Sequence, residues 1–362
     1  MSEFNSPEIA RLLKQQVNFL SAETATSPVI ISSRIRLARN LKGFPFPGAA
    51  DPTVRQEVAD SAAAAIRRSR ALGRGSMSFN IAELSVLERE ILLERHLASR
   101  SLLEGEAGQM LHISANEALA VMVNEEDHLR MQAILPGSQL RKAWKMVNAL
   151  DDKLSGQLDI AYDSKLGFLT SCLSNVGTGI RISQMLHLPA LTIDGSIKQL
   201  ERGLPKLGLT MRGMFGEGSE NLGFFYQISN QSTLGESEMA IMEHLEQVIG
   251  QVVDHEENAR LKLLEQNRTR LLDKVGRSFA ALRYSYILPS KEAFAALSGV
   301  RLGVDLKMFH ALDSKLLNDL LIAANSGHLQ YNAGRLLSEA ERDAYRAQVM
   351  REALKKNYDR EL

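Results

Sequence analysis

The spacing of hydrophobic and polar positions divides the chain into two regions. Up to about residue 235, short apolar runs typical of strands alternate with apolar stripes of helical period. From Glu236 onward the period is helical almost throughout. The first helix of that region carries an apolar stripe made of Met239, Met242, Leu245, Ile249 and Val252. We therefore predict an α+β domain over residues 1–260 and a small all-helical domain over residues 261–362.

Individual strands and helices can be assigned from the same pattern. The strands are predicted at residues 28–40, 108–116, 118–135, 167–172 and 223–231. The helices are predicted at residues 51–70, 85–97 and 137–154, with a further helix over 180–191 that follows a glycine loop at 173–179. Asp51 is the predicted N-cap of its helix, with Pro52 in the first turn. Ser338 and Glu341 form a capping box that predicts the start of the last helix.

Composition excludes several classes of protein. Of 362 residues, 43 are Lys or Arg and 43 are Asp or Glu. The chain therefore has no excess of positive charge of the kind that binds nucleic acid or an anionic membrane. The single cysteine, Cys172, excludes an intrachain disulfide and a thiolate metal cage. No stretch approaches the ~20 apolar residues of a membrane span, and the N-terminal segment lacks the apolar core of a signal peptide. We expect a soluble, cytoplasmic protein.

Three arginines stand close together in the stretch SSRIRLARN, Ser32 to Asn40. On a strand, Arg34 and Arg36 project from the same face, because side chains alternate with period two. Two guanidinium forks on one face suit the oxygens of a phosphate, although a solvated strand face would have the same pattern. Arg39 has the opposite parity, which indicates a structural or peripheral role.

Three further segments concentrate ionisable groups beside predicted strands. The segment NEEDHLR, 124–130, follows an apolar run. Burying charged groups there costs free energy unless they form ion pairs or take part in function. In TSCLSNVGTGIR, 170–181, Cys172 precedes a glycine loop and a predicted helix start, a position that favours anions and lowers the pKa of a thiol. In RGMFGEGSE, 212–220, glycines surround Glu217. A surface turn, an inert cysteine and a plain flexible loop remain open as alternatives.

Together these four segments resemble the phosphagen (guanidino) kinase superfamily, and more closely its bacterial protein arginine kinase branch, the McsB type. The segments occur in the family's order, and the resemblance covers most of residues 29–260. It extends to the C-terminal domain through RDAYRA, 342–347, which fits the branch's RDxxRA motif for phosphoarginine. The resemblance implies an antiparallel sheet flanked by helices, like the catalytic domain of glutamine synthetase, followed by a small all-helical domain.

The resemblance also implies a role for individual residues. Glu126 and Glu217 would grip the acceptor guanidinium, and Cys172 would lie beside it. Phosphoarginine would bind to Arg342, Asp343, Arg346 and Ala347. Mg²⁺ would be held through ATP, without a direct protein ligand. ATP would be bound by Ser32, Ser33, Arg34, Ile35, Arg36, His96, Arg130, Arg181, Ile182, Ser183, Gln184, Met185, Arg212, Gly213, Met214, Phe215 and Gly216.

The function that the resemblance implies is transfer of the ATP γ-phosphoryl group to arginine side chains of proteins. Such marks would direct proteins to Clp-type proteolysis and regulate a stress-response repressor. The implied partners are unfolded proteins, the repressor, a zinc-binding activator and a Clp ATPase. A homodimer or higher oligomer is expected, with no membrane and no direct nucleic-acid contact.

Two departures from the family pattern leave other functions open. The family's usual Cys-Pro-Ser/Thr is here Cys172-Leu173-Ser174, which keeps the hydroxyl but loses the rigid proline. The small-molecule members carry a helical domain of ~100 residues before the SSR motif, whereas 31 residues precede it here, which favours a protein acceptor. A kinase for a free guanidino metabolite and a non-enzymatic phosphoarginine-binding adaptor are the alternatives.

Overall fold

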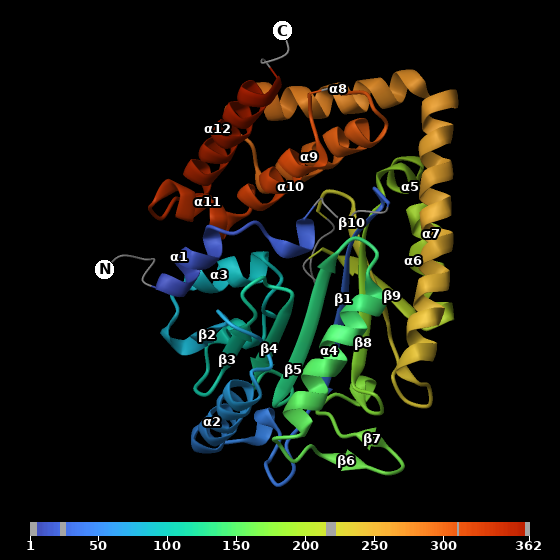
Figure 1. Ribbon diagram of the computed structural model, residues 1–362. Helices are drawn as coiled ribbons and strands as arrows, with labels where there is room; N and C mark the ends of the chain where they lie inside the picture. Colours follow the sequence, from blue (N-terminus) through green and yellow to red (C-terminus); the bar gives the residue numbers. More distant parts are fainter. Residues whose placement is uncertain (1–5, 22–26, 215–221, 310, 359–362) are drawn as a thin grey trace.

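An eight-stranded antiparallel sheet forms the centre of the computed structural model, which describes residues 6–21, 27–214, 222–309 and 311–358 (Figure 1). Its strand order is β2-β3-β4-β5-β1-β8-β10-β9, and a separate small hairpin pairs β6 with β7. The expected antiparallel sheet flanked by helices is confirmed. The strands are β1 (Ile30–Arg39), β2 (Met77–Asn80), β3 (Met110–Ile113), β4 (Leu119–Val123), β5 (Leu129–Pro136), β6 (Tyr162–Asp163), β7 (Gly167–Phe168), β8 (Ile180–His187), β9 (Leu209–Gly213) and β10 (Phe225–Asn230).

The two faces of the sheet have opposite character. Ile35 and Leu37 of β1 are fully buried on one face, where three helices cover the central strands. Arg34 and Arg36 alternate with them and therefore project from the other face. The covering helices are α2 (Pro52–Ser69), α4 (Leu140–Ser155) and α7 (Glu238–Gln266). This alternation leaves a polar surface on which a site can be built.

The second face is covered at its two ends. Near β2–β4 it packs against α1 (Pro7–Leu13) and α3 (Val86–Glu94), around buried residues that include Ile91 and Met122. At the far end, the short 3₁₀ turn Asn18–Leu20 and the C-terminal helices pack against Met185 and Phe225. The central part of this face lines a cleft between them.

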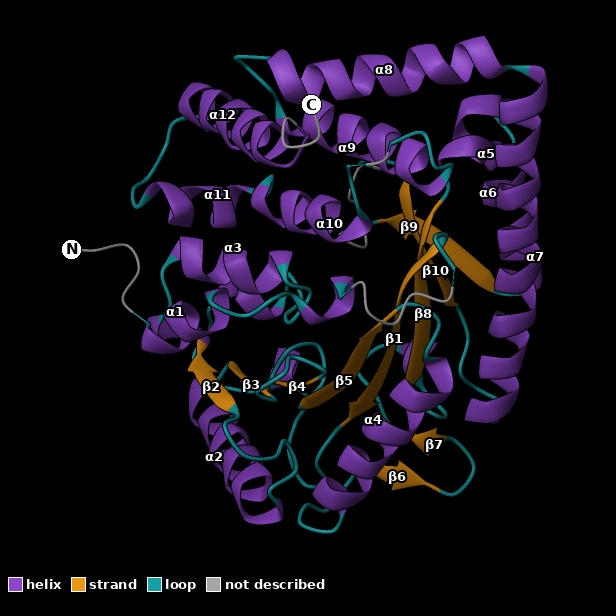
Figure 2. Cartoon of the chain, turned by 45° about the horizontal axis from the view of Figure 1, so that its top comes forward, coloured by secondary structure: helices purple, strands orange, loops and turns teal. Residues whose placement is uncertain are grey.

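The C-terminal part of the chain is helical, as predicted, and lies at the end of the sheet (Figures 1 and 2). Its helices are α8 (Arg268–Tyr284), α9 (Ser290–Asp305), α10 (Ser314–Ala323), α11 (Ser326–Ala333) and α12 (Glu339–Tyr358). Two short helices, α5 (Pro189–Asp194) and α6 (Ile197–Gly203), connect β8 to β9. The predicted domain boundary after residue 260 falls inside α7. Among the described residues, no helix combines the length and the apolar character that a membrane span requires.

Three predicted elements differ from those in the structure. The segment 118–135 is not one strand, because Asn124 adopts a left-handed φ of 54° and starts the turn that separates β4 from β5. The segment 180–191 is not a helix up to residue 188: residues 180–187 form strand β8, with Ile180 and Ile182 facing the core and Arg181 the opposite side. A helix begins only at Pro189. The predicted strand 167–172 shrinks to β7.

The predicted helix caps are confirmed. The carboxylate of Asp51 accepts hydrogen bonds from the backbone N–H groups of Thr53 and Val54 at the start of α2, at 2.8 and 3.0 Å. At the start of α12, Glu341 accepts from the backbone N–H of Ser338, and its own N–H donates to the Ser338 hydroxyl. Local polar groups therefore define these helix starts without help from the core.

Candidate active site

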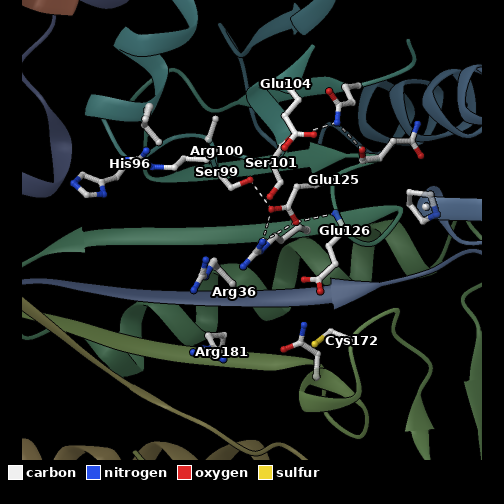
Figure 3. Close-up of a pocket in the computed structure, with 18 of the residues that line it drawn as sticks. Arg36, His96, Ser99, Arg100, Ser101, Glu104, Glu125, Glu126, Cys172 and Arg181 are labelled. Atoms are coloured by element: carbon white, nitrogen blue, oxygen red, sulfur yellow. Dashed lines mark hydrogen bonds and ion pairs between the residues drawn. The ribbon is translucent and has the colours of Figure 1, made fainter. Parts of the chain in front are cut away.

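A cleft of about 920 Å³ opens on the polar face of the sheet (Figure 3). Four arginines from three adjacent strands line it: Arg34 and Arg36 from β1, Arg130 from β5 and Arg181 from β8. Arg36 and Arg181 stand directly opposite one another in the antiparallel register, and Ala38, two residues further along β1, faces Arg130. Residues separated by more than 90 positions in the sequence thus converge because their strands are neighbours.

The electrostatics of the cleft favour an anion. Burial, and then the charges of Arg130 and Arg181, lower the pKa of Arg34 to about 10. Burial and the same neighbours, with Arg34, also lower the pKa of Arg36 well below its usual value. The Nε atom of Arg36 is buried with no hydrogen-bond partner among the described residues. Like charges held opposite one another are destabilising, so an anion bound among them would relieve the repulsion.

Two hydrogen-bonded pairs hold this arginine cluster in place. Glu125 accepts two hydrogen bonds from Nη1 of Arg130, at 2.5 and 2.7 Å, and a third from the Ser99 hydroxyl. Burial alone would raise the pKa of Glu125, but Arg130 and Ser99 lower it below its usual value. Arg34 donates to the side-chain oxygen of Gln227 at 2.7 Å. The sequence alone indicates no role for Ser99, Glu125 or Gln227, although Glu125 stands in the NEED motif itself.

Glu126 and Cys172 meet at one end of the cleft, next to the arginines (Figure 3). Burial raises the pKa of the Glu126 carboxyl, and the charges of Asp127 and Glu125 add to this, while Arg130 and a hydrogen bond with Cys172 act against it. The Sγ atom of Cys172 lies 3.1 Å from the Ser174 hydroxyl. A carboxylate with a raised pKa, next to a thiol and open to solvent, suits the binding and deprotonation of a cation.

His96 lines the cleft beyond the arginines, at the end that α3 reaches (Figure 3). It follows the helix with a left-handed φ of 56°, and its ring contacts Phe19 edge-on at a centroid distance of 4.5 Å. Burial, together with the charge of Arg34, lowers the pKa of His96 to about 3. The imidazole is therefore neutral at pH 7. Its backbone carbonyl accepts from Gln132 at 2.8 Å, which ties it to β5.

The structure brings only part of the predicted ATP-binding set into the cleft. Ser33, Ile35, Ile182 and Gln184 have the opposite parity, and their side chains face the helix-covered side. Residues of the predicted set that lie at the cleft are Arg34, Arg36, His96, Arg130, Arg181, Arg212 and Met214. Ser32, Ser183 and Met185 share the face of Arg34 but are buried outside the cleft lining, and Gly213 ends β9. Phe215, Gly216 and Glu217 lie outside the described residues.

The glycine loop after Cys172 serves a different purpose from the one predicted. Gly177 and Gly179 have φ values of 110° and 65°, and a Cβ on Gly179 would lie 2.6 Å from the carbonyl oxygen of Ala38. The loop leads into strand β8 rather than a helix, so the predicted helix N-terminus beside Arg181 does not exist. Gly179 permits close packing against β1 and Gly177 against the backbone of Thr233, and the cleft obtains its positive charge from side chains.

The C-terminal RDAYRA segment lies in α12, which packs against α8 and α11. Arg346 is buried and donates to the backbone carbonyls of Ala324 and Leu288 and to Asp343, at 2.6 to 2.9 Å. Arg342 is half-buried, and its Nη1 donates to the carbonyl of Leu337. The two arginines share a helix face as predicted, but Arg346 and Asp343 already form an internal pair. The buried Ala347 packs in the apolar core of this region.

Comparisons with known proteins agree with these features. The sequence model of the C-terminal catalytic domain of ATP:guanido phosphotransferases matches residues 57–259, and that of the protein-arginine kinase McsB C-terminal domain matches residues 268–361. The protein-arginine kinase of Moorella thermoacetica is 41% identical over 345 residues, covering 94% of this chain and 98% of the relative. That of Pelotomaculum thermopropionicum is 42% identical over 347 residues, with coverages of 94% and 97%.

The chain belongs to the protein-arginine kinase family. Solved structures support the fold of its catalytic region. The duplicated taurocyamine kinase of Schistosoma mansoni, with bound transition-state-analogue components, has a TM-score of 0.59 at 24% identity; the match covers 68% of this chain and 35% of that chain. Lombricine kinase has a TM-score of 0.54 at 21% identity, covering 67% and 71%. Among the described residues of this family member, no group of three or more His, Cys, Asp or Glu side chains is placed to hold a metal ion.

Proposed function

We propose that this protein transfers the γ-phosphoryl group of ATP to arginine side chains of other proteins. The observation that carries the proposal is one cleft in which four arginines lie beside Glu126 and Cys172. The polyanionic donor ATP needs a positively charged environment, which the arginines supply. The cationic acceptor arginine needs a negatively charged group beside it, which Glu126 supplies. Relatives that are named protein-arginine kinase and about 40% identical over nearly the whole chain support the choice of acceptor.

The arginine cluster fits the phosphates of ATP, which supplies the phosphoryl group and carries Mg²⁺. Arg34, Arg36 and Arg181 would bind phosphate oxygens, because their mutual repulsion is relieved by negative charge. Glu125 fixes the orientation of the Arg130 guanidinium through its Nη1 atom. The remaining N–H groups of that guanidinium would donate to phosphate oxygens. In a phosphoryl transfer the protein contributes mainly positioning and charge neutralisation, which is what a fixed arginine cluster provides. The neutral His96 would lie against the nucleotide.

Glu126 would bind the acceptor guanidinium and take its proton. A guanidinium has a pKa above ~12, so a base must remove a proton as its nitrogen attacks phosphorus. The raised pKa of Glu126 makes it a better base than an ordinary carboxylate. Glu217 is proposed as the second carboxylate on the strength of the motif alone. Cys172, held by Ser174, would orient the guanidinium rather than form a covalent bond.

The C-terminal motif is proposed as a phosphoarginine site, with Arg342 as its accessible phosphate ligand. Arg346 and Asp343 would form the rigid part of this site, since they already form an ion pair at 2.6 Å. Protein substrates follow from the proposed activity. Delivery of marked proteins to a Clp-type protease, control of a repressor, a zinc-binding activator and a homodimer remain expectations from the family resemblance.

The test is to incubate the protein with Mg-ATP and either unfolded casein or free arginine, and to measure acid-labile phosphate. We expect label on casein, and its loss in Glu126→Gln without loss of ATP binding. Glu57→Gln, an exposed carboxylate on α2, is the matched control. Label on free arginine alone would indicate a metabolite kinase, and label on neither would indicate an adaptor; both results would overturn the proposal.

A further inference from the structure

Four large apolar side chains are exposed on the loop that follows Cys172 and on two segments that are hydrogen-bonded to this loop. Leu173 is 88% exposed, Tyr162 61%, Leu234 54% and Leu166 50%. Leu173 stands between Cys172 and Ser174, which both line the cleft. The other three belong to the β6–β7 hairpin and to the segment after β10. We call these four residues the apolar rim.

Hydrogen bonds and a ring contact tie the segments that carry this rim to one another. Phe168 of the hairpin pairs with Gly177 of the Cys172 loop, its N–H donating to the Gly177 carbonyl at 2.8 Å. The hydroxyl of Thr233 donates to the carbonyls of Val176 and Ser174, at 2.7 and 3.1 Å, which places Leu234 beside the same loop. The ring of Tyr162 lies edge-on against Phe168, with centroids 5.2 Å apart.

The rim is fixed to the sheet and is not a loose loop. The guanidinium of Arg39 lies 3.4 Å above the ring of Phe168 and pairs with the buried Asp151 of α4. At the hairpin tip, Asp163 accepts hydrogen bonds from the N–H groups of Lys165 and Leu166, at 2.8 and 2.9 Å. A preorganised apolar surface loses little conformational entropy when a partner binds.

From these contacts we infer that the apolar rim binds an extended segment of the protein substrate, with apolar side chains close in sequence to the acceptor arginine. This inference rests on the proposed function. Continuity with the cleft identifies the occupant: Leu173 adjoins Cys172, and Glu126 supplies the negative charge that an arginine needs. An extended chain advances ~3.3 Å per residue, so residues close in sequence to the arginine would pass Leu173 as they leave the cleft. Exposed apolar side chains gathered next to a polar site are typical of a protein-binding surface.

The test uses two peptides with the same central arginine, one flanked by leucines and one by serines, and measures kcat/KM for each with the full-length protein. The wild type should favour the leucine peptide by about fivefold, equivalent to about 1 kcal/mol. The double variant Leu166→Ser/Leu173→Ser should bring the ratio close to one by raising KM for the leucine peptide, with KM for ATP unchanged. Leu272→Ser, on α8 and 48% exposed, is the matched control and should keep the wild-type ratio.

Each other outcome has a definite meaning. A wild-type ratio near one, or a ratio that the double variant does not change, would overturn the inference and indicate that the rim does not contact the substrate. A change in the oligomeric mass of the double variant by sedimentation would also overturn it, in favour of a second copy. Phosphoarginine on neither peptide and on no protein substrate would refute the proposed function instead.

Discussion

Arg130 donates two hydrogen bonds from one nitrogen, Nη1, to the two carboxylate oxygens of Glu125, at 2.5 and 2.7 Å. The pair lies at the turn between β4 and β5, and the charge of Glu125 raises the pKa of Arg36, against the effect of burial. Glu125 is almost fully buried, whereas the adjacent Glu126 is exposed to the cleft. Two neighbouring glutamates therefore have separate tasks, one positioning an arginine and the other facing the acceptor.

Replacing Glu125 by glutamine should separate positioning from binding. Removing its charge makes the cleft more positive, so the Kd for ATP should stay unchanged or fall. Arg130 would lose its fixed orientation, and we expect kcat to decrease by about tenfold or more, since small misplacements of catalytic groups have large effects. Steady-state kinetics and calorimetry measure the two effects, with Glu57→Gln as the control. A weaker ATP affinity with normal kcat would contradict this role.

Arg39 should contribute to stability and not to catalysis. It is almost fully buried and donates to Asp151, and to the carbonyls of Ala38 and Thr178. Arg39→Met would leave a buried carboxylate unpaired, so the free energy of unfolding should fall by about 3–5 kcal/mol in urea titrations. Arg141→Met, which removes an exposed ion pair with Glu246, should change it by less than about 1 kcal/mol. Equal effects of the two substitutions would show that the burial of Arg39 is unimportant.

The two arginines of the C-terminal motif should behave differently. Arg346→Ala would leave two carbonyl groups and Asp343 without their donor, so we expect a loss of about 2–4 kcal/mol in the free energy of unfolding. Arg342→Ala should lower it by less than about 1 kcal/mol and yet weaken phosphoarginine binding in calorimetry. Normal phosphoarginine affinity in a folded Arg342→Ala protein would remove that residue from the proposed site.

Acid should destabilise the protein in part through His112. Burial lowers the pKa of His112 to about 4, below the ordinary value near 6.5 that the unfolded chain has. Below pH 6.5 the unfolded chain therefore binds a proton that the folded protein does not. The free energy of unfolding therefore decreases as the pH is lowered. Between pH 7.5 and 5 this one group should lower the free energy of unfolding by about 2 kcal/mol.

His112→Asn should remove that contribution, so the stability difference between wild type and variant should shrink by about 2 kcal/mol over the same pH range. Urea titrations at several pH values measure it, and His255→Asn, at an exposed position of α7, is the control. Parallel pH profiles for wild type and His112→Asn would mean that His112 is protonated equally in both states.

The sequence predicted the arginine cluster better than the elements that carry it. Period-two alternation placed Arg34 and Arg36 on one face and Arg39 on the other, and the structure confirms both. The same alternation holds in residues 180–187, but Ile182, Met185 and Leu186 also have the spacing of one helix face over a short window. Only pairing with β1 and β10 distinguishes the strand, and those partners are far away in the sequence.

Local signals determined what depends on neighbouring residues: the caps at Asp51 and Ser338, the strand parity of β1 and the motifs that identify the family. The tertiary structure decided which side chains meet. It buried Glu125 in an ion pair with Arg130, brought Glu126 within hydrogen-bond distance of Cys172 and paired Arg346 with Asp343. The physical reason is that burial and charge pairing act between residues brought together by the sheet register and by packing, and no short-range period in the sequence encodes those distances.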